Sequence, residues 1–96
     1  MRLTWSAFTL ADRDAIFTHI EADSPRAAAT VDEHIAQAVL RLIEFLESGR
    51  SGGPGTRELV IPRTPYVAAY ALTSDSVRIL RVLHGAHVWP VDFASG

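Results

Sequence analysis

The chain has 96 residues, the length of one domain and too short for two independent hydrophobic cores. Hydrophobic residues make up 48% and charged residues 21%, which excludes a disordered tail, and the lack of cysteine excludes disulfides, cysteine-ligated zinc and thiol catalysis. Nine arginines and no lysine face eleven acids, and this net charge of −2 is too acidic for a non-specific nucleic-acid binder.

The first half of the chain predicts a strand and two helices. Residues 2–5 are typical of an edge strand, and Ser6 fits the N-cap of a helix that extends to about Ala22. Ser24 and Pro25 fit the N-cap and first position of a second helix. The apolar stripe of this helix consists of Ala28, Val31, Ile35, Val39, Leu42 and Leu46. The short linker predicts an antiparallel helical hairpin.

The second half predicts three strands joined by tight turns. Residues 49–55 are expected to end the second helix and form a mobile loop, which lacks the lysine and spacing of a phosphate-binding loop. The expected strands cover residues 57–61, 66–72 and 76–83. The predicted fold class is α+β in the order β-α-α-β-β-β, with the helical hairpin packed on one face of a small antiparallel sheet.

The sequence also sets expectations for the cellular compartment and for the C-terminal residues 84–96. No segment has the apolar length of a signal peptide or a membrane span, so we expect one cytoplasmic domain over residues 1–96 and no membrane partner. In the tail, Trp89 and Phe93 are expected to seal the open end of the sheet. Tyr66 and Tyr70 are expected in the core or at the sheet edge rather than as base-stacking platforms.

The order of these elements and three of their sequences resemble the RelE/ParE toxin superfamily. The resemblance is carried by Arg57–Ile61, Tyr66–Tyr70 and Val77–His87, and its most specific part is Val82-Leu83-His84-Gly85. It covers nearly the whole chain. It implies the toxin of a type II toxin–antitoxin pair, with growth inhibition and plasmid stabilisation as its roles, held in a hetero-oligomer with a cognate antitoxin protein.

The superfamily contains two activities, between which this sequence must be placed. RelE-like members cleave mRNA on the ribosome with arginines, lysines and a proton donor and acceptor, whereas ParE-like members inhibit DNA gyrase by binding. This chain has Val67 in place of a RelE arginine, His87 in place of another, and no lysine. It therefore resembles the ParE-like members, for which gyrase is the expected target and no cofactor is expected. The alternatives are a RelE-type mRNA endonuclease and a degenerate member that retains only antitoxin binding.

A nuclease would need a proton donor and cations beside the scissile phosphate. The candidate catalytic residues for that case are His87, Arg81 and Arg57, with His87 as the general acid. The alternative for the arginines is surface pairing with Glu58, Asp75 or a helix acid. His84 is interpreted as a strand-end imidazole bonded to the backbone, and a metal site at His84 and His87 is not expected, since a third ligand is missing.

Apolar surface in this short chain exceeds what one sheet face can cover. It includes the stripe of the second helix, Phe8 and Phe17 on the first, and both faces of the last strand. Strict alternation there places Val77 and Ile79 on one face and Arg78, Leu80 and Val82 on the other. We expect a disordered, amphipathic antitoxin segment to fold onto the excess. Residues 1–49 carry a net charge of −4 and residues 50–96 carry +2, so basic antitoxin residues are expected against the helices.

Overall fold

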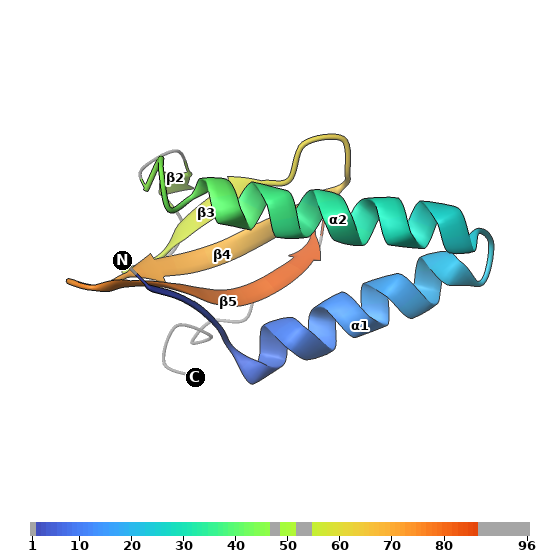
Figure 1. Ribbon diagram of the computed structural model, residues 1–96, viewed down its shortest axis with the longest axis horizontal. Coiled ribbons are helices and arrows are strands. Elements are labelled where there is room, and N and C mark those ends of the chain that lie inside the picture. Colours follow the sequence, from blue (N-terminus) through green and yellow to red (C-terminus); the bar gives the residue numbers. More distant parts are fainter. Residues whose placement is uncertain (1, 47–48, 52–54, 87–96) are drawn as a thin grey trace.

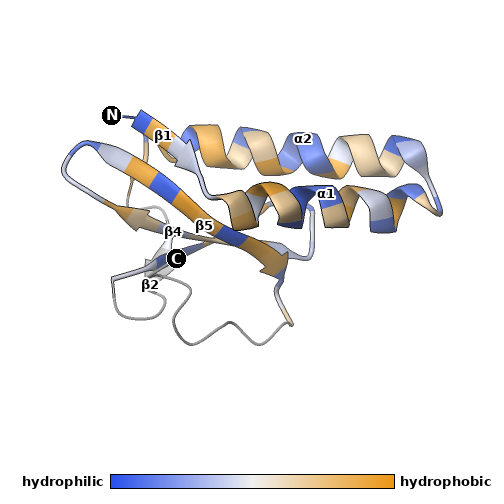
Figure 2. Cartoon of the chain, turned by 90° about the horizontal axis from the view of Figure 1, so that it is seen from below, coloured by the Kyte–Doolittle hydropathy of each residue, from blue (hydrophilic) through white to orange (hydrophobic). Residues whose placement is uncertain are grey.

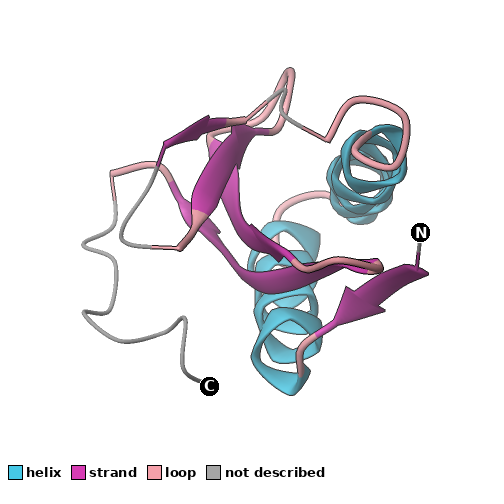
Figure 3. Ribbon diagram, turned by 90° about the vertical axis from the view of Figure 1, so that its left-hand side faces the viewer, coloured by secondary structure: helices cyan, strands magenta, loops and turns pink. Residues whose placement is uncertain are grey.

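The computed structural model describes residues 2–46, 49–51 and 55–86. It contains helices α1 (Ala7–Glu21) and α2 (Pro25–Arg41), and strands β1 (Arg2–Trp5), β2 (Arg50–Ser51), β3 (Arg57–Val60), β4 (Tyr66–Leu72) and β5 (Ser76–His84). The two helices form a hairpin that covers one side of the sheet (Figure 1, Figure 3). The predicted α+β fold class and helical hairpin are thereby confirmed, while His87, Trp89 and Phe93 lie outside the described residues.

The sheet is mixed rather than wholly antiparallel. Its strand order is β1-β5-β4-β3-β2, and every neighbouring pair is antiparallel except β1 and β5, which pair in parallel with Leu3 opposite Val77. The expected antiparallel sheet was wrong at this pair because the helical hairpin and the meander return the chain to β1 in the same direction. The expected loop also contains β2, whose two residues pair with Arg57 and Glu58.

The predicted helix starts are confirmed, and the second helix ends earlier than expected. The Ser6 hydroxyl accepts a hydrogen bond from the Thr9 amide, and Ser24 caps α2 in the same way, with proline in the first turn. After α2 ends at Arg41, one further turn follows, closed by a 3.0 Å bond from the Phe45 amide to the Arg41 carbonyl. This turn leaves the end of the apolar stripe packed against the core.

The core lies between α2 and the helix-facing side of β4 and β5. Its buried members are Ile35, Val39, Leu42, Ile61, Tyr66, Ala68, Tyr70, Val77, Ile79 and Val82. The larger of these side chains each remove apolar surface worth about 1.5–3 kcal/mol from water. Both tyrosines therefore belong to the core, which confirms their interpretation as packing residues.

A bulge in β5 changes which of its side chains face the core. Ala69 lies opposite Arg81 and Tyr70 lies opposite Ile79, so Leu80 has no partner on β4. The bulge shifts the alternation by one residue, and Val82 joins Ile79 in the core. The expectation that Val82 and Ile79 point to opposite faces was therefore wrong. Hydrophilic residues are interspersed among hydrophobic ones along β5 (Figure 2).

Polar side chains of α1 complete the edge of β5 where β1 ends. Ser6 Oγ donates to Leu80 O at 2.8 Å, Thr9 Oγ1 donates to Ile79 O at 3.1 Å, and Val82 N donates to Asp12 Oδ2 at 3.0 Å. These three side chains are spaced by three residues and share one face of α1. The helix thus satisfies backbone groups that a longer β1 would otherwise pair.

Candidate functional site

The Arg81 side chain is fixed by an ion pair with Asp12 of α1. Its Nε and Nη2 atoms each donate to an oxygen of Asp12 at 2.8 Å, and the two side chains are 23% and 10% exposed. The hydrogen bond to Asp12, helped by the charge of that carboxylate and opposed by burial, raises the pKa of Arg81 above its ordinary value. Its guanidinium also lies 5.7 Å from the centre of the Phe8 ring. Of the two roles considered for this arginine, the structure shows pairing with a helix acid.

The Arg57 side chain donates a hydrogen bond to the segment that follows α2. It lies opposite Tyr70 in the sheet, and its Nη2 donates to the Gly49 carbonyl at 2.9 Å. The Tyr70 hydroxyl accepts from the Gly49 amide at 3.1 Å and donates to the Leu46 carbonyl at 3.0 Å. Arg57 and Tyr70 therefore hold the same short segment against the sheet.

The described residues do not bring the candidate nuclease group together. Arg57 lies opposite Tyr70 and Arg81 opposite Ala69, neighbouring β4 residues that alternate between the two faces of the sheet. His84 Nδ1 accepts from the Ala86 amide at 3.1 Å, and its ring packs edge-on against Tyr66, as expected for a strand-end imidazole. His87, the proposed general acid, lies outside the described residues.

Several large apolar side chains face outward, as the excess of apolar residues predicted. They are Phe8, Leu10, Leu40, Ile43, Phe45 and Val60, and Phe8 and Phe45 are each 57% exposed. Phe8 and Leu10 lie at the start of α1, and the Phe8 ring is beside the Arg81 guanidinium. Phe45 and Val60 lie on a separate part of the surface, where the end of α2 meets β3. Exposed apolar groups of this size commonly mark protein-binding surfaces.

An apolar groove runs between the end of α2 and β3. It has a volume of about 330 Å³ and is lined by Ala38, Arg41, Phe45, Leu59, Val60 and Pro62. The short β2 pairs with only the first two residues of β3, so Leu59 and Val60 extend beyond it. We call this feature the α2–β3 groove. Its lining and its exposed rim suit the apolar side of a partner segment.

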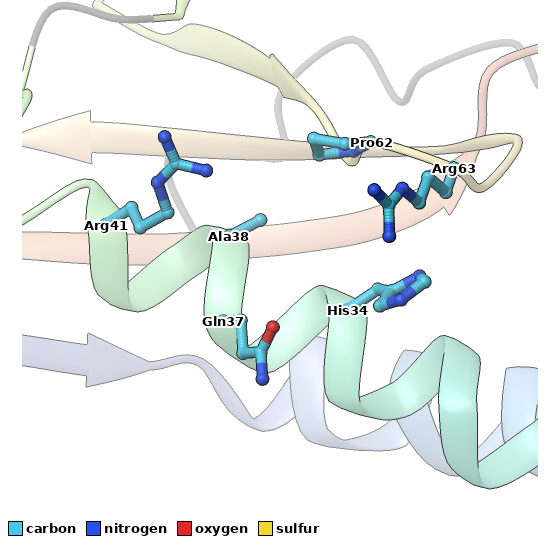
Figure 4. Close-up of a pocket in the computed structure, with 6 residues that line it drawn as sticks. All are labelled: His34, Gln37, Ala38, Arg41, Pro62 and Arg63. Atoms are coloured by element: carbon cyan, nitrogen blue, oxygen red, sulfur yellow. The ribbon is translucent and has the colours of Figure 1, made fainter.

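A second cavity adjoins this groove, and its residues were missed in the sequence. His34, Arg41 and Arg63 line it, although they come from two turns of α2 and from the β3–β4 turn (Figure 4). Their separation along the chain hid the cluster. No local signal marked it, because the commonest turn with proline second accepts most residues third and the positive φ of Arg63 is seen only in the structure.

Other kinds of site are not formed within the described ranges. No group of three His, Asp or Glu side chains there is arranged to hold a metal ion. Neither helix has both the length and the apolar character needed to cross a membrane, within the part of the chain that the structure describes. The described surface therefore offers cavities, two of which adjoin, and exposed apolar side chains.

Comparisons with known proteins find toxins, under both ParE and RelE names. Residues 3–89 match the family described as ParE toxin of type II toxin-antitoxin system, parDE. Toxin Y4kP of Sinorhizobium fredii is 42% identical over 93% of both chains, and toxin RelE2 of Caulobacter vibrioides is 34% identical over 91% of this chain and 98% of its own. A solved structure titled "Chromosomal ParDE TA system from P. aeruginosa" superposes with a TM-score of 0.78 at 31% identity, covering 88% of this chain and 95% of that one.

Proposed function

Because this chain belongs to the ParE toxin family of type II toxin–antitoxin systems, we propose that it inhibits DNA gyrase by binding and is neutralised by its cognate antitoxin. The observation that carries the choice of binding over RNA cleavage is the engagement of Arg81 by Asp12. A guanidinium held by a bidentate carboxylate cannot neutralise a scissile phosphate without first breaking that pair. Arg57 is likewise directed to a backbone carbonyl of the fold.

The α2–β3 groove supports the antitoxin part of this proposal. An amphipathic segment can place apolar side chains against Phe45, Leu59 and Val60, which removes exposed apolar surface from water. Folding of a disordered segment onto the toxin would bury roughly 1,000–3,000 Å². Because the antitoxin binds only the folded toxin, the complex should melt at a higher temperature than the toxin alone.

Gyrase inhibition without RNA cleavage is the first expected result. Purified toxin should block supercoiling of relaxed plasmid by gyrase, and primer extension on translated mRNA after induction should show no new ends. The absence of several phosphate-neutralising side chains, each worth a factor of about 100 or more in rate, accounts for intact mRNA. His87→Ala should remain toxic for the same reason. Codon-specific cleavage with normal supercoiling would instead establish the RelE-type alternative.

Phe45→Asp should weaken antitoxin binding about 30-fold or more, since it places a charge in the apolar groove at a large anchoring side chain. The fold should persist because this side chain is largely exposed. Leu40→Asp is the matched control, with 56% exposure and no part in lining the groove. Calorimetric titration with the protein encoded by the neighbouring gene measures both. Equal loss of affinity in the two variants would show that the groove is not the docking site.

A further inference from the structure

The turn between β3 and β4 holds an arginine in an unfavourable backbone conformation. Thr64 N donates to Ile61 O at 3.3 Å across this turn, Pro62 is its second residue, and Arg63, the third, has φ of 64°. Glycine and asparagine adopt this left-handed conformation readily, and other residues do so at a cost in stability. Turn geometry therefore does not account for arginine at this position.

The side chain of Arg63 points into a cavity between the turn and α2. The cavity has a volume of about 260 Å³ and is lined by His34, Gln37, Ala38, Arg41, Pro62 and Arg63. Figure 4 shows the Arg63 guanidinium directed towards His34, while Arg41 extends from α2 towards the sheet. The Gln37 amide turns the other way and donates to Glu33 at 3.1 Å.

This cavity is cationic and its charges are uncompensated. The ion pairs among the described residues are Arg13–Asp32 and Arg81–Asp12, and neither the Arg41 nor the Arg63 side chain has an ion pair or a hydrogen bond there. No carboxylate lines the cavity. The Nδ1 atom of His34 is buried and has no hydrogen-bond partner within the described residues. Two guanidinium groups line one cavity with an unsatisfied buried nitrogen, and the Arg63 group is directed towards His34, which marks a place for an anionic ligand.

The neighbouring groove identifies the kind of anion. The cavity and the α2–β3 groove share Ala38, Arg41 and Pro62, so a single ligand can lie across both. Such a ligand presents apolar groups to Phe45 and Val60 and an oxyanion to the arginines. A peptide with an acidic side chain near apolar ones meets both demands, whereas a nucleic acid would bring a polyanionic backbone to a chain of net charge −2.

We propose that Arg41 and Arg63 together bind an aspartate or glutamate side chain of the antitoxin, next to the apolar residues that fill the α2–β3 groove. This inference rests on the proposed neutralisation by an antitoxin. Guanidinium forks fit a carboxylate in a bidentate manner, which makes the contact specific in orientation. The antitoxin would thus carry an acidic residue for this cavity in addition to the basic residues expected against the helices. Two acids of the toxin helices, Asp12 and Asp32, are already paired with arginines of the same chain.

Charge-removing variants of the two arginines test this contact. Arg63→Asn keeps a residue that tolerates the left-handed turn, and Arg41→Gln keeps a good helix former on α2. The matched control is Arg78→Gln, an exposed arginine on β5 away from both cavities. Each pocket variant should bind the neighbouring gene's protein about tenfold more weakly and with a shallower salt dependence, while Arg78→Gln stays within about twofold of the unmodified toxin.

Each outcome of the titration has a distinct meaning. If the pocket variants and the control bind equally well, the acidic anchor is disproved while antitoxin binding stands. If the unmodified toxin does not bind the neighbouring protein at all, the proposed neutralisation itself fails. If a short single-stranded RNA binds, loses affinity in Arg63→Asn and is not displaced by the antitoxin, the pocket takes phosphate instead, which overturns the proposal. Arg63→Asn should melt at or above the temperature of the unmodified toxin, which separates lost binding from lost folding.

Discussion

Asp12→Ala is expected to lower the free energy of unfolding by about 3 kcal/mol. The Asp12 carboxylate accepts three hydrogen bonds, two from Arg81 and one from the Val82 amide, and its side chain is only 10% exposed. Removing it leaves a largely buried guanidinium and a backbone amide without their partner. Each of these groups then bears an uncompensated desolvation cost. Urea unfolding followed by circular dichroism measures the change.

Asp14→Ala is the matched control, because Asp14 lies on the same helix and is exposed. It should change stability by less than about 0.5 kcal/mol. A double-mutant cycle with Arg81→Ala then isolates the pair from the Val82 bond. If Asp12→Ala were as stable as Asp14→Ala, the Arg81–Asp12 pair would not hold α1 to β5. The pair should persist at high pH, since a guanidinium with a raised pKa loses this contribution only as the pH rises through that raised value.

Gly49→Ala is expected to cost about 2–3 kcal/mol through overpacking. A Cβ atom at this position would lie 2.5 Å from the Tyr70 hydroxyl oxygen and 2.7 Å from the Glu58 carbonyl oxygen. Neither neighbour can move easily. The Tyr70 ring is fully buried, and its hydroxyl both accepts and donates a hydrogen bond. The Glu58 carbonyl belongs to strand β3. Thermal unfolding of the variant measures the loss.

Gly55→Ala separates this steric effect from backbone conformation. Gly55 has φ of 74°, and among the described residues beyond its chain neighbours no atom lies within 4 Å of the place that a Cβ would occupy, so we expect conformational strain to dominate for alanine there. That strain is worth about 1–2 kcal/mol. Gly49→Ala should therefore be the more destabilising of the two. The opposite order would mean that the segment after α2 moves away from Tyr70 without difficulty.

Local signals in the sequence were enough to predict most elements of the fold. Ser6 and the Ser24-Pro25 pair start the helices because their side chains and ring geometry act within one turn. The 66–72 strand was predicted to the residue, since its composition and flanking turns are also local. The order of the elements followed from these segments taken along the chain, and that order in turn carried the resemblance to toxins of this family.

Features that depend on distant partners could not be predicted from the sequence. Asp12 and Arg81 are 69 residues apart, so nothing in either segment indicates their pairing. The bulge at Leu80 adds one residue to β5 and has no sequence signature there, which is why the face of Val82 was misassigned. Arg41 and Arg63 likewise line one cavity only because the fold brings α2 beside the β3–β4 turn.

The position of β5 between β1 and β4 has a consequence for the order of folding during synthesis. β1 and the polar face of α1 are made first, yet their partners on β5 lie about 70 residues later in the chain. Loops of that length must close before these contacts form, which slows folding relative to a helical protein of the same size. At about 5–20 residues per second, roughly 4–14 s separate the synthesis of α1 from that of its partners on β5. A growing chain therefore cannot join β1 to the rest of the sheet until β5 has been made.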